Sequence, residues 1–172
     1  DQPHLGGGAQ PQPLHQHLLF VEDSVVMCTP FNEVIALDPA TGRQKWRFDP
    51  KISLNQNPAN RFNCRGVAYW RDEQAAAGAA CRSRIFTGTN DARVIALDAK
   101  TGQPCADFGD SGEVKIDPGI PLRWPGEFQI TSAPVVSHGV VVVGSSISDN
   151  GRVDAPHLLM RAFDAGTGRP HW

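Results

Sequence analysis

Two groups of residues in this sequence could do chemistry at a ligand. Arg65 follows Cys64 in the segment NCRGVAYW. Its planar guanidinium could bind a carboxylate through two hydrogen bonds, or it could form a surface ion pair with a nearby acid. Asp149 and Asn150 lie in the segment SSISDNG, where a carboxylate and an amide oxygen from one loop could bind a hard cation. Asp-Asn-Gly is also typical of a plain turn, so both alternatives stay open.

Several other kinds of site are not indicated. The six histidines show no metal-ligand spacing, and no Ser-His-Asp or Cys-His arrangement has support. The glycine run Gly6–Gly8 does not follow a strand or open a helix, so it is not a phosphate loop. A net charge of −2 gives no reason to expect nucleic acid as a partner. No apolar run approaches the roughly 20 residues that a membrane-spanning helix needs.

The sequence contains four cysteines, at positions 28, 64, 81 and 105, and none of them forms a CxxC pair. An even number of cysteines is compatible with two disulfides formed in an oxidising compartment, and equally with buried free thiols. Four cysteines allow three pairings, and the spacing does not choose among them.

A short repeat indicates which elements must position these residues. It reads ALDPATG at Ala36–Gly42, ALDAKTG at Ala96–Gly102 and AFDAGTG at Ala162–Gly168. The final glycines are 60 and then 66 residues apart, which is too long for a helical solenoid and suits four-stranded propeller blades with long loops. A tryptophan follows the glycine by four residues in the first and third copies, whereas the second copy has Ala106.

The chemistry of the repeat predicts a tight turn followed by an aromatic contact. The Asp side chain can accept backbone N–H groups across the bend, the Thr hydroxyl can do so more weakly, and the Gly supplies a positive φ. The tryptophan can then lie between neighbouring blades with its N–H on a backbone carbonyl. Because the middle copy lacks this ring, we expect its joint to pack less tightly.

The strand pattern around the repeats predicts an all-β fold, a partial β-propeller of about three four-stranded blades. The blades are expected at about 18–48, 64–108 and 131–172, after a loop or disordered lead-in over 1–17. The fourth strand of each blade is expected at Gln44–Phe48, Gln103–Phe108 and Arg169–Trp172. Three blades leave exposed lateral edges, so the chain is expected to join further blades or to associate. A stand-alone oligomerising β-domain is a weaker alternative.

In combination, several segments resemble the pyrroloquinoline-quinone (PQQ) dependent alcohol and sugar dehydrogenases, most closely the membrane-anchored glucose and quinate dehydrogenases. They are the repeats together with CTPFN at 28–32, NCRGVAYW at 63–70, CADFG at 105–109, SAPVV at 132–136 and VVGSSISDN at 142–150. The resemblance implies an eight-bladed propeller, of which this chain holds only the early blades.

The resemblance also implies roles for particular residues. Arg65 matches an arginine that reaches the quinone oxygens or a carboxylate of the cofactor. Thr131 and Ser146 match hydroxyl positions that bind its carboxylates, although bonds to the backbone at strand ends are an equal alternative for each. Asp149 and Asn150 match the family's metal-ligand position, for Ca²⁺ or Mg²⁺. Arg61 stands where glucose dehydrogenases tend to have a cofactor-contacting histidine.

The implied function is oxidation of a sugar or polyol hydroxyl with PQQ, with electrons passing to ubiquinone, in a periplasmic and inner-membrane-anchored protein. The family's catalytic Asp lies in later blades, so no catalytic residue is assigned and this chain alone is expected to be inactive. The alternative function is a non-catalytic propeller scaffold for protein–protein interaction. Such a scaffold would need the repeats but not Arg65, Ser146 and the Asp149–Asn150 pair.

Overall fold

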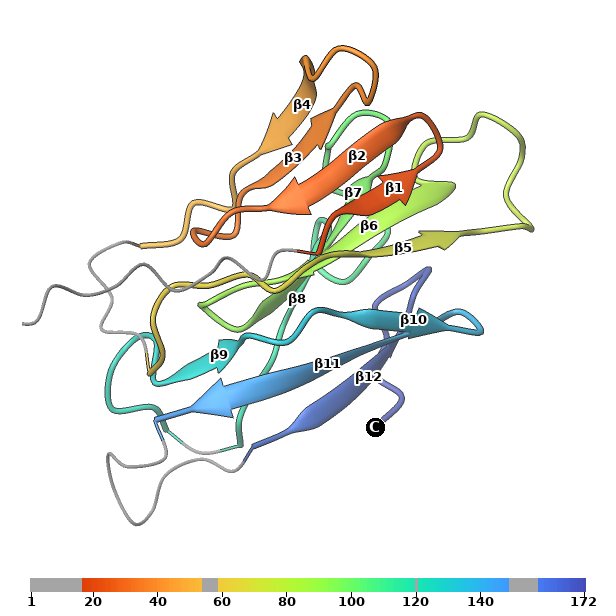
Figure 1. The fold of residues 1–172 in the computed structure, drawn as a ribbon. Helices are drawn as coiled ribbons and strands as arrows, with labels where there is room; N and C mark the ends of the chain where they lie inside the picture. The colour runs from red at the N-terminus through yellow and green to blue at the C-terminus, as the bar shows by residue number, and fades with distance from the viewer. Residues whose placement is uncertain (1–16, 54–58, 120, 149–157) are drawn as a thin grey trace, which may run out of the picture.

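The computed structural model describes residues 17–53, 59–119, 121–148 and 158–172. Within these residues the protein is all-β, with three four-stranded antiparallel sheets and no helix. Figure 1 shows the sheets following one another along the molecule in chain order. The predicted fold class, a partial β-propeller of three blades, is therefore confirmed.

Each sheet is a meander of neighbouring strands. The first sheet contains β1 (Leu19–Val21), β2 (Ser24–Cys28), β3 (Val34–Leu37) and β4 (Gln44–Phe48), in that order. The second contains β5 (Ala68–Arg71), β6 (Ser83–Gly88), β7 (Arg93–Asp98) and β8 (Glu113–Lys115). The third contains β10 (Val135–Ser137), β11 (Val140–Ile147) and β12 (Met160–Asp164), and β9 (Phe128–Ile130) pairs with the far end of β11.

Two of the three predicted fourth strands are wrong. The segment after β7 makes only an isolated bridge between Leu97 and Pro104, and the fourth place is taken by β8. The segment after β12 likewise makes only a bridge between Phe163 and Pro170. Proline has no N–H to donate to a strand ladder, and both segments carry one directly after the turn. In the first blade this position is Gln44, and β4 forms as expected.

The three repeat turns have the predicted geometry. Asp38 Oδ1 accepts the backbone N–H groups of Ala40 and Thr41 at 3.0 and 2.7 Å, together with the Thr41 hydroxyl. The turns that begin at Asp98 and Asp164 repeat these bonds. The closing glycines have φ of 69°, 72° and 72°, a left-handed region that suits glycine. The recurrence of the motif therefore reflects a repeated local structure.

The first joint between blades is closed by a tryptophan, as predicted. Trp46 is buried and donates its indole N–H to Ala99 O at 3.1 Å. The second joint, which lacks a tryptophan, is nevertheless close-packed. Gly109 N donates to Thr167 O at 2.9 Å, and a Cβ built on Gly168 would lie 2.7 Å from Gly109 N. The expectation of a looser joint is therefore wrong, because backbone fills the place of the missing ring.

The second joint also contains a buried arginine. The Arg84 side chain lies over the Trp70 ring, 5.7 Å from its centroid, and donates to Gly166 O at 2.8 Å. Its guanidinium also reaches Cys81 O and the Asp107 carboxylate. Charged and polar bonds thus connect the second and third blades where the first and second are connected by an indole.

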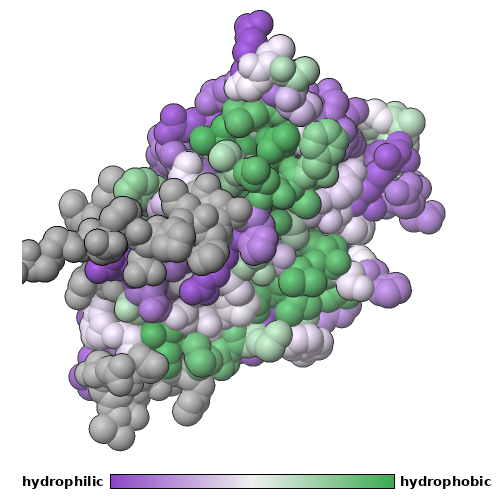
Figure 2. All heavy atoms as spheres, in the orientation of Figure 1, coloured by the Kyte–Doolittle hydropathy of each residue, from purple (hydrophilic) through white to green (hydrophobic). Residues whose placement is uncertain are grey.

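The apolar side chains are divided between the interior and the sheet faces. Two buried clusters lie between successive sheets, one around Phe86 and Phe128 and the other around Trp46 and Ile95. Figure 2 shows further hydrophobic atoms on the surface over the first sheet. The most exposed large apolar residues are Leu18, Phe20, Val135, Leu158, Met160 and Trp172. Among the described residues, no helix is long and apolar enough to cross a membrane.

Candidate functional site

The predicted site residues that the structure describes lie at one end of the three sheets. Strand register places the Asp-Thr-Gly turns at one end, since they follow β3, β7 and β12. The opposite end, called here the site end, is where β3 and β7 begin and β11 finishes. Arg65 precedes β5 and Ser146 lies in the last part of β11, so both are at the site end (Figure 1).

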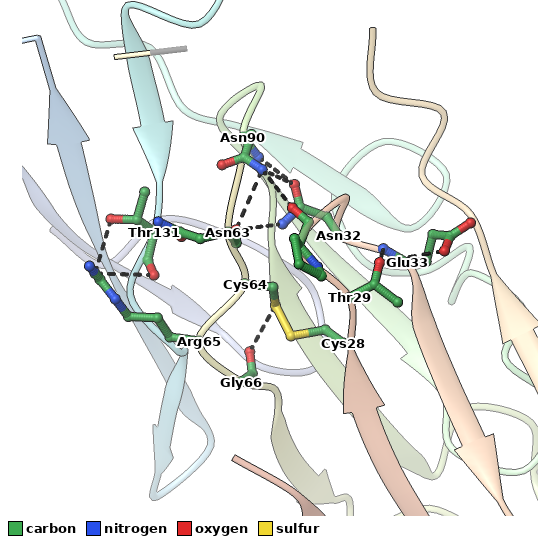
Figure 3. The surroundings of a disulfide bond; sticks show 11 residues. Cys28, Thr29, Asn32, Glu33, Asn63, Cys64, Arg65, Gly66, Asn90 and Thr131 are labelled. Carbon is green, nitrogen blue, oxygen red and sulfur yellow. Dashed lines mark hydrogen bonds between the residues drawn. A yellow bond between two sulfur atoms is a disulfide. The ribbon is translucent and has the colours of Figure 1, made fainter. Parts of the chain in front are cut away.

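Arg65 and Thr131 are in direct contact. The exposed Arg65 guanidinium donates from one Nη to both the carbonyl oxygen and the hydroxyl of Thr131, each at 3.4 Å (Figure 3). Thr131 is buried, directly after β9. These long bonds hold the guanidinium at the end of β9, while its remaining N–H groups can still bind an acceptor.

Ser146 lies on the same strand pair. It is directly opposite Gln129 in the β9–β11 ladder, so the two side chains lie on one face. Asn60 bridges them, because its backbone N–H donates to Gln129 Oε1 at 3.0 Å and its Nδ2 donates to Ser146 Oγ. The predicted hydroxyl is thus held by a residue that the sequence analysis did not select.

The other predicted positions are placed less closely. Arg61 follows Asn60 at the site end and is exposed, with no hydrogen bond or ion pair to the described residues. Asp149 and Asn150, the predicted metal ligands, lie outside the described residues. The last described residue before them is Ser148, which follows β11 and donates its N–H to Glu127 O at 3.2 Å.

Buried amide side chains behind the site were missed by the sequence analysis. Asn32, Asn90 and Gln129 are fully buried and hydrogen-bonded to one another. One signal was available for Gln129, since a single polar residue between Phe128 and Ile130 in a strand must be satisfied inside the protein. Asn32 has φ of 62°, a conformation in which Asn is enriched, but that position does not show its partners.

All four cysteines form disulfides, which resolves the pairing that the spacing left open. Cys28 is bonded to Cys64, and Cys81 is bonded to Cys105. The first bond lies at the site end and connects the last residue of β2 to the residue before Arg65 (Figure 3). The second bond lies at the opposite end, near the Asp98 turn, since Cys81 N donates to Asp98 Oδ2. The alternative of buried free thiols is wrong.

The chain matches the family model described as "PQQ: Glucose/ethanol/alcohol dehydrogenase, beta-propeller domain" over residues 6–172. It therefore belongs to the propeller family of the PQQ-dependent dehydrogenases. Curated relatives include quinoprotein glucose dehydrogenase A of Acinetobacter calcoaceticus, 32% identical over 163 residues, and the glycerol dehydrogenase large subunit of Gluconobacter thailandicus, 38% identical over 152 residues. Each match covers 88% of this chain.

A third relative is the quinate/shikimate dehydrogenase (quinone) of Acinetobacter baylyi, 36% identical over 97% of this chain. Among solved structures, the quinohemoprotein alcohol dehydrogenase of Comamonas testosteroni superposes with a TM-score of 0.69 at 27% identity, over 90% of this chain. The chain spans about a fifth of the length of each of these proteins: 20% for the glucose, glycerol and alcohol dehydrogenases and 22% for the quinate enzyme.

Proposed function

We propose that this chain forms early blades of a quinoprotein dehydrogenase and contributes part of its PQQ site. The observation that carries the proposal is the convergence of Arg65, Thr131 and Ser146 at one end of the sheets. A scaffold propeller would need the turns and the joints between blades, but it would not need these donors at its opposite end.

The donor set fits the cofactor. PQQ is a flat tricarboxylate with quinone oxygens, so it needs a cation and hydroxyl donors. The Arg65 guanidinium supplies the cation, and the Ser146 and Thr131 hydroxyls supply neutral donors. When bound, PQQ takes up the two electrons released as a substrate CH–OH group becomes a carbonyl. The residues of this chain hold and orient the cofactor, while the base that removes the hydroxyl proton lies in other blades.

A divalent cation, Ca²⁺ or Mg²⁺, is part of the proposal. Asp149 and Asn150 would supply a carboxylate and an amide oxygen, which are ligands that both ions accept. These two residues follow shortly after β11 in the sequence, and β11 carries Ser146, so the proposed metal ligands and the proposed cofactor-binding hydroxyl are close along the chain. Such an ion would polarise the quinone as a Lewis acid.

The proposed substrate is a sugar or polyol, and ubiquinone is the proposed electron acceptor. The names of the relatives support the substrate class, since they include glucose, glycerol and quinate dehydrogenases. We place the protein in the periplasm, with an inner-membrane anchor in the full-length form, because its two disulfides require an oxidising compartment. Without the remaining blades this chain alone is inactive.

Titration of the full-length apoprotein with PQQ, in the presence of Ca²⁺ or Mg²⁺, tests the proposal. We expect a change in PQQ absorbance on binding and dye-linked oxidation of at least one compound among glucose, glycerol, quinate and ethanol. Arg65→Ala should weaken PQQ binding about 10- to 100-fold, as expected for loss of a charge-assisted pair of about 1.5–3 kcal/mol. Absence of PQQ binding by the wild-type protein would contradict the proposal and favour the scaffold.

A further inference from the structure

A chain of carboxamide side chains crosses the molecule behind the site. We call it the amide ladder, and it consists of Asn32, Asn90, Gln129 and Asn60. Asn90 donates its backbone N–H and its Nδ2 to Asn32 Oδ1, each at 2.8 Å (Figure 3). Gln129 Nε2 donates to Asn90 Oδ1 at 3.3 Å. The ladder therefore joins the loop after β2, the loop after β6 and strand β9, which belong to three different sheets.

The donor direction along the ladder is set by backbone groups. A backbone N–H can only donate, so the Asn32 atom that faces Asn90 N must be oxygen. The Gln129 atom that faces Asn60 N must likewise be oxygen, at 3.0 Å. The other end of the Gln129 amide is then nitrogen, and it must point to an acceptor. Asn90 Oδ1 is that acceptor, so these buried amides have one consistent arrangement.

The ladder ends at an exposed residue beside Ser146. Asn32, Asn90 and Gln129 are fully buried, whereas Asn60 is exposed. The Asn60 segment is fixed at two points, through Ala59 N to Gly126 O at 2.7 Å and through Asn60 N to Gln129 Oε1. Its side-chain Nδ2 donates to Ser146 Oγ. The buried part of the ladder thus supports one exposed hydrogen bond, from Asn60 to the Ser146 hydroxyl that is proposed to bind the cofactor.

This bond determines what Ser146 can offer to a ligand. A hydroxyl has one hydrogen and two lone pairs, and the Asn60 amide occupies one lone pair. The hydroxyl hydrogen is left to point at an acceptor. A carboxylate is a strong acceptor for such a hydrogen.

We propose that Asn60 is a positioning residue that makes Ser146 a hydrogen-bond donor to a carboxylate of PQQ, and that the amide ladder holds Asn60 in place. This inference rests on the proposed function, since it takes PQQ as the ligand. It adds a residue that acts through Ser146 rather than by touching the cofactor.

The test is PQQ affinity of the full-length apoprotein, measured by absorbance or fluorescence titration, in a double-mutant cycle. Asn60→Asp keeps the size of the side chain and the backbone N–H, but its carboxylate can only accept and would capture the Ser146 hydrogen. We expect Asn60→Asp to weaken PQQ binding about tenfold and Asn60→Ala about two- to threefold. In a Ser146→Ala background, Asn60→Asp should change the affinity less than twofold.

The double-mutant cycle distinguishes an effect of Asn60 that acts through Ser146 from direct repulsion between the new carboxylate and PQQ. If Asn60→Asp weakens PQQ binding as much without the Ser146 hydroxyl as with it, the new charge acts directly on the cofactor and the inference is overturned. It is also overturned if Asn60→Asp leaves the affinity unchanged while wild-type protein binds PQQ, a result that leaves the proposed function standing. If wild-type protein does not bind PQQ, both fail.

Two further variants test the ladder itself. Gln129→Met keeps the volume but removes the acceptor for Asn60 N, so it should lower PQQ affinity only when Ser146 is present. Ser145→Ala is the matched control, because Ser145 Oγ bonds to Leu159 N and O rather than to the ladder. It should lower the thermal midpoint without changing PQQ affinity. A Gln129→Met variant that lowers only the thermal midpoint would overturn the role of the ladder.

Discussion

The indole of Trp46 lies against Gly102, the glycine that closes the turn of the following blade. A Cβ built on Gly102 would lie 2.5 Å from Trp46 Cε3 and 2.7 Å from Cδ2. The motif glycine therefore has two functions, since it adopts a left-handed backbone and also leaves room for the preceding blade's ring. The Trp46 ring, which follows the first repeat, thus occupies the space that the absence of a side chain at Gly102 leaves in the second repeat.

The first prediction compares two glycines of the same motif. Gly102→Ala should destabilise the protein by about 1–3 kcal/mol more than Gly42→Ala, the cost of overpacking a closed interior. Both residues have positive φ, but a Cβ on Gly42 would meet nothing within 4 Å. Gly42→Ala therefore measures the backbone cost alone. Urea unfolding of the two variants gives the difference, and equal midpoints would contradict the fit of ring and glycine.

A second prediction concerns the pH dependence of the turn aspartates. Burial raises the pKa of Asp98, but hydrogen bonds from Cys81, Thr101 and Lys100 outweigh it and hold the pKa below the ordinary value of 3.8. A lowered folded-state pKa stabilises the fold above the unfolded value, and this contribution is lost as pH falls through the folded pKa. Stability should therefore fall on acidification below about pH 4.

The matched variants are Asp98→Asn and Asp38→Asn. Asp98 uses both oxygens, because Oδ2 accepts Cys81 N at 2.6 Å, so an amide there places a donor against a donor. Asp98→Asn should cost about 1.5–3 kcal/mol at pH 7 and flatten the acid limb. The Asp38 side chain accepts from Ala40 and Thr41 at Oδ1, and an Asn side chain can keep these bonds. The loss of stability in Asp38→Asn should therefore be smaller. Equal losses measured by chemical unfolding at pH 7 would count against this account.

The third prediction separates the two disulfides. Cys28–Cys64 and Cys81–Cys105 close loops with sequence separations of 36 and 24, so removal of either should cost about 3–4 kcal/mol in the loop-entropy account. Only the first bond adjoins Arg65. Replacing Cys28 and Cys64 with Ala should therefore weaken PQQ binding as well as stability, while the variant of the other pair should lose stability alone. Equal PQQ affinities for the two variants would refute the link to the site.

A fourth prediction concerns the buried arginine of the second joint. The Arg84 side chain is 4% exposed and donates to groups of its own blade and of the third blade. Arg84→Lys loses the fork of donors and the guanidinium over the Trp70 ring, so it should cost about 2–3 kcal/mol. Arg47→Lys serves as the control, because Arg47 is half-exposed and forms a surface ion pair with Glu33, where an exchange costs about 0–1 kcal/mol. Thermal unfolding compares them.

The parts of the fold that sequence could predict are those with local causes. Asp38, Thr41 and Gly42 act within five residues, so three copies of their pattern gave the turns and the blade count. The loss of two predicted fourth strands depended on Pro104 and Pro170, whose effect on the ladder is visible in the sequence. That β8 takes the fourth place in the second sheet is not visible there. Strand β9 pairs with the far end of β11, beyond β10, and nothing within β9 indicates that partner.

The site was predicted unevenly for a similar reason. Arg65, Thr131 and Ser146 lie in segments that resemble known quinoproteins, and the structure brings them to one end. The amide ladder is different, because each contact joins residues that are 39 to 86 positions apart, with no spacing rule to connect them. The compensation of Ala106 by Gly109 and Arg84 could not be foreseen either, since both act through tertiary packing.

The separation of turns from site residues has a consequence for how such a molecule diversifies. The Asp-Thr-Gly turns and the ring contacts on them occupy one rim, where a change in length would disturb the joints between modules. Strands β4, β8 and β11 end on the other rim, where the long connections that follow them begin. Replacing these connections can change the side chains offered to a ligand without changing how the blades pack against one another.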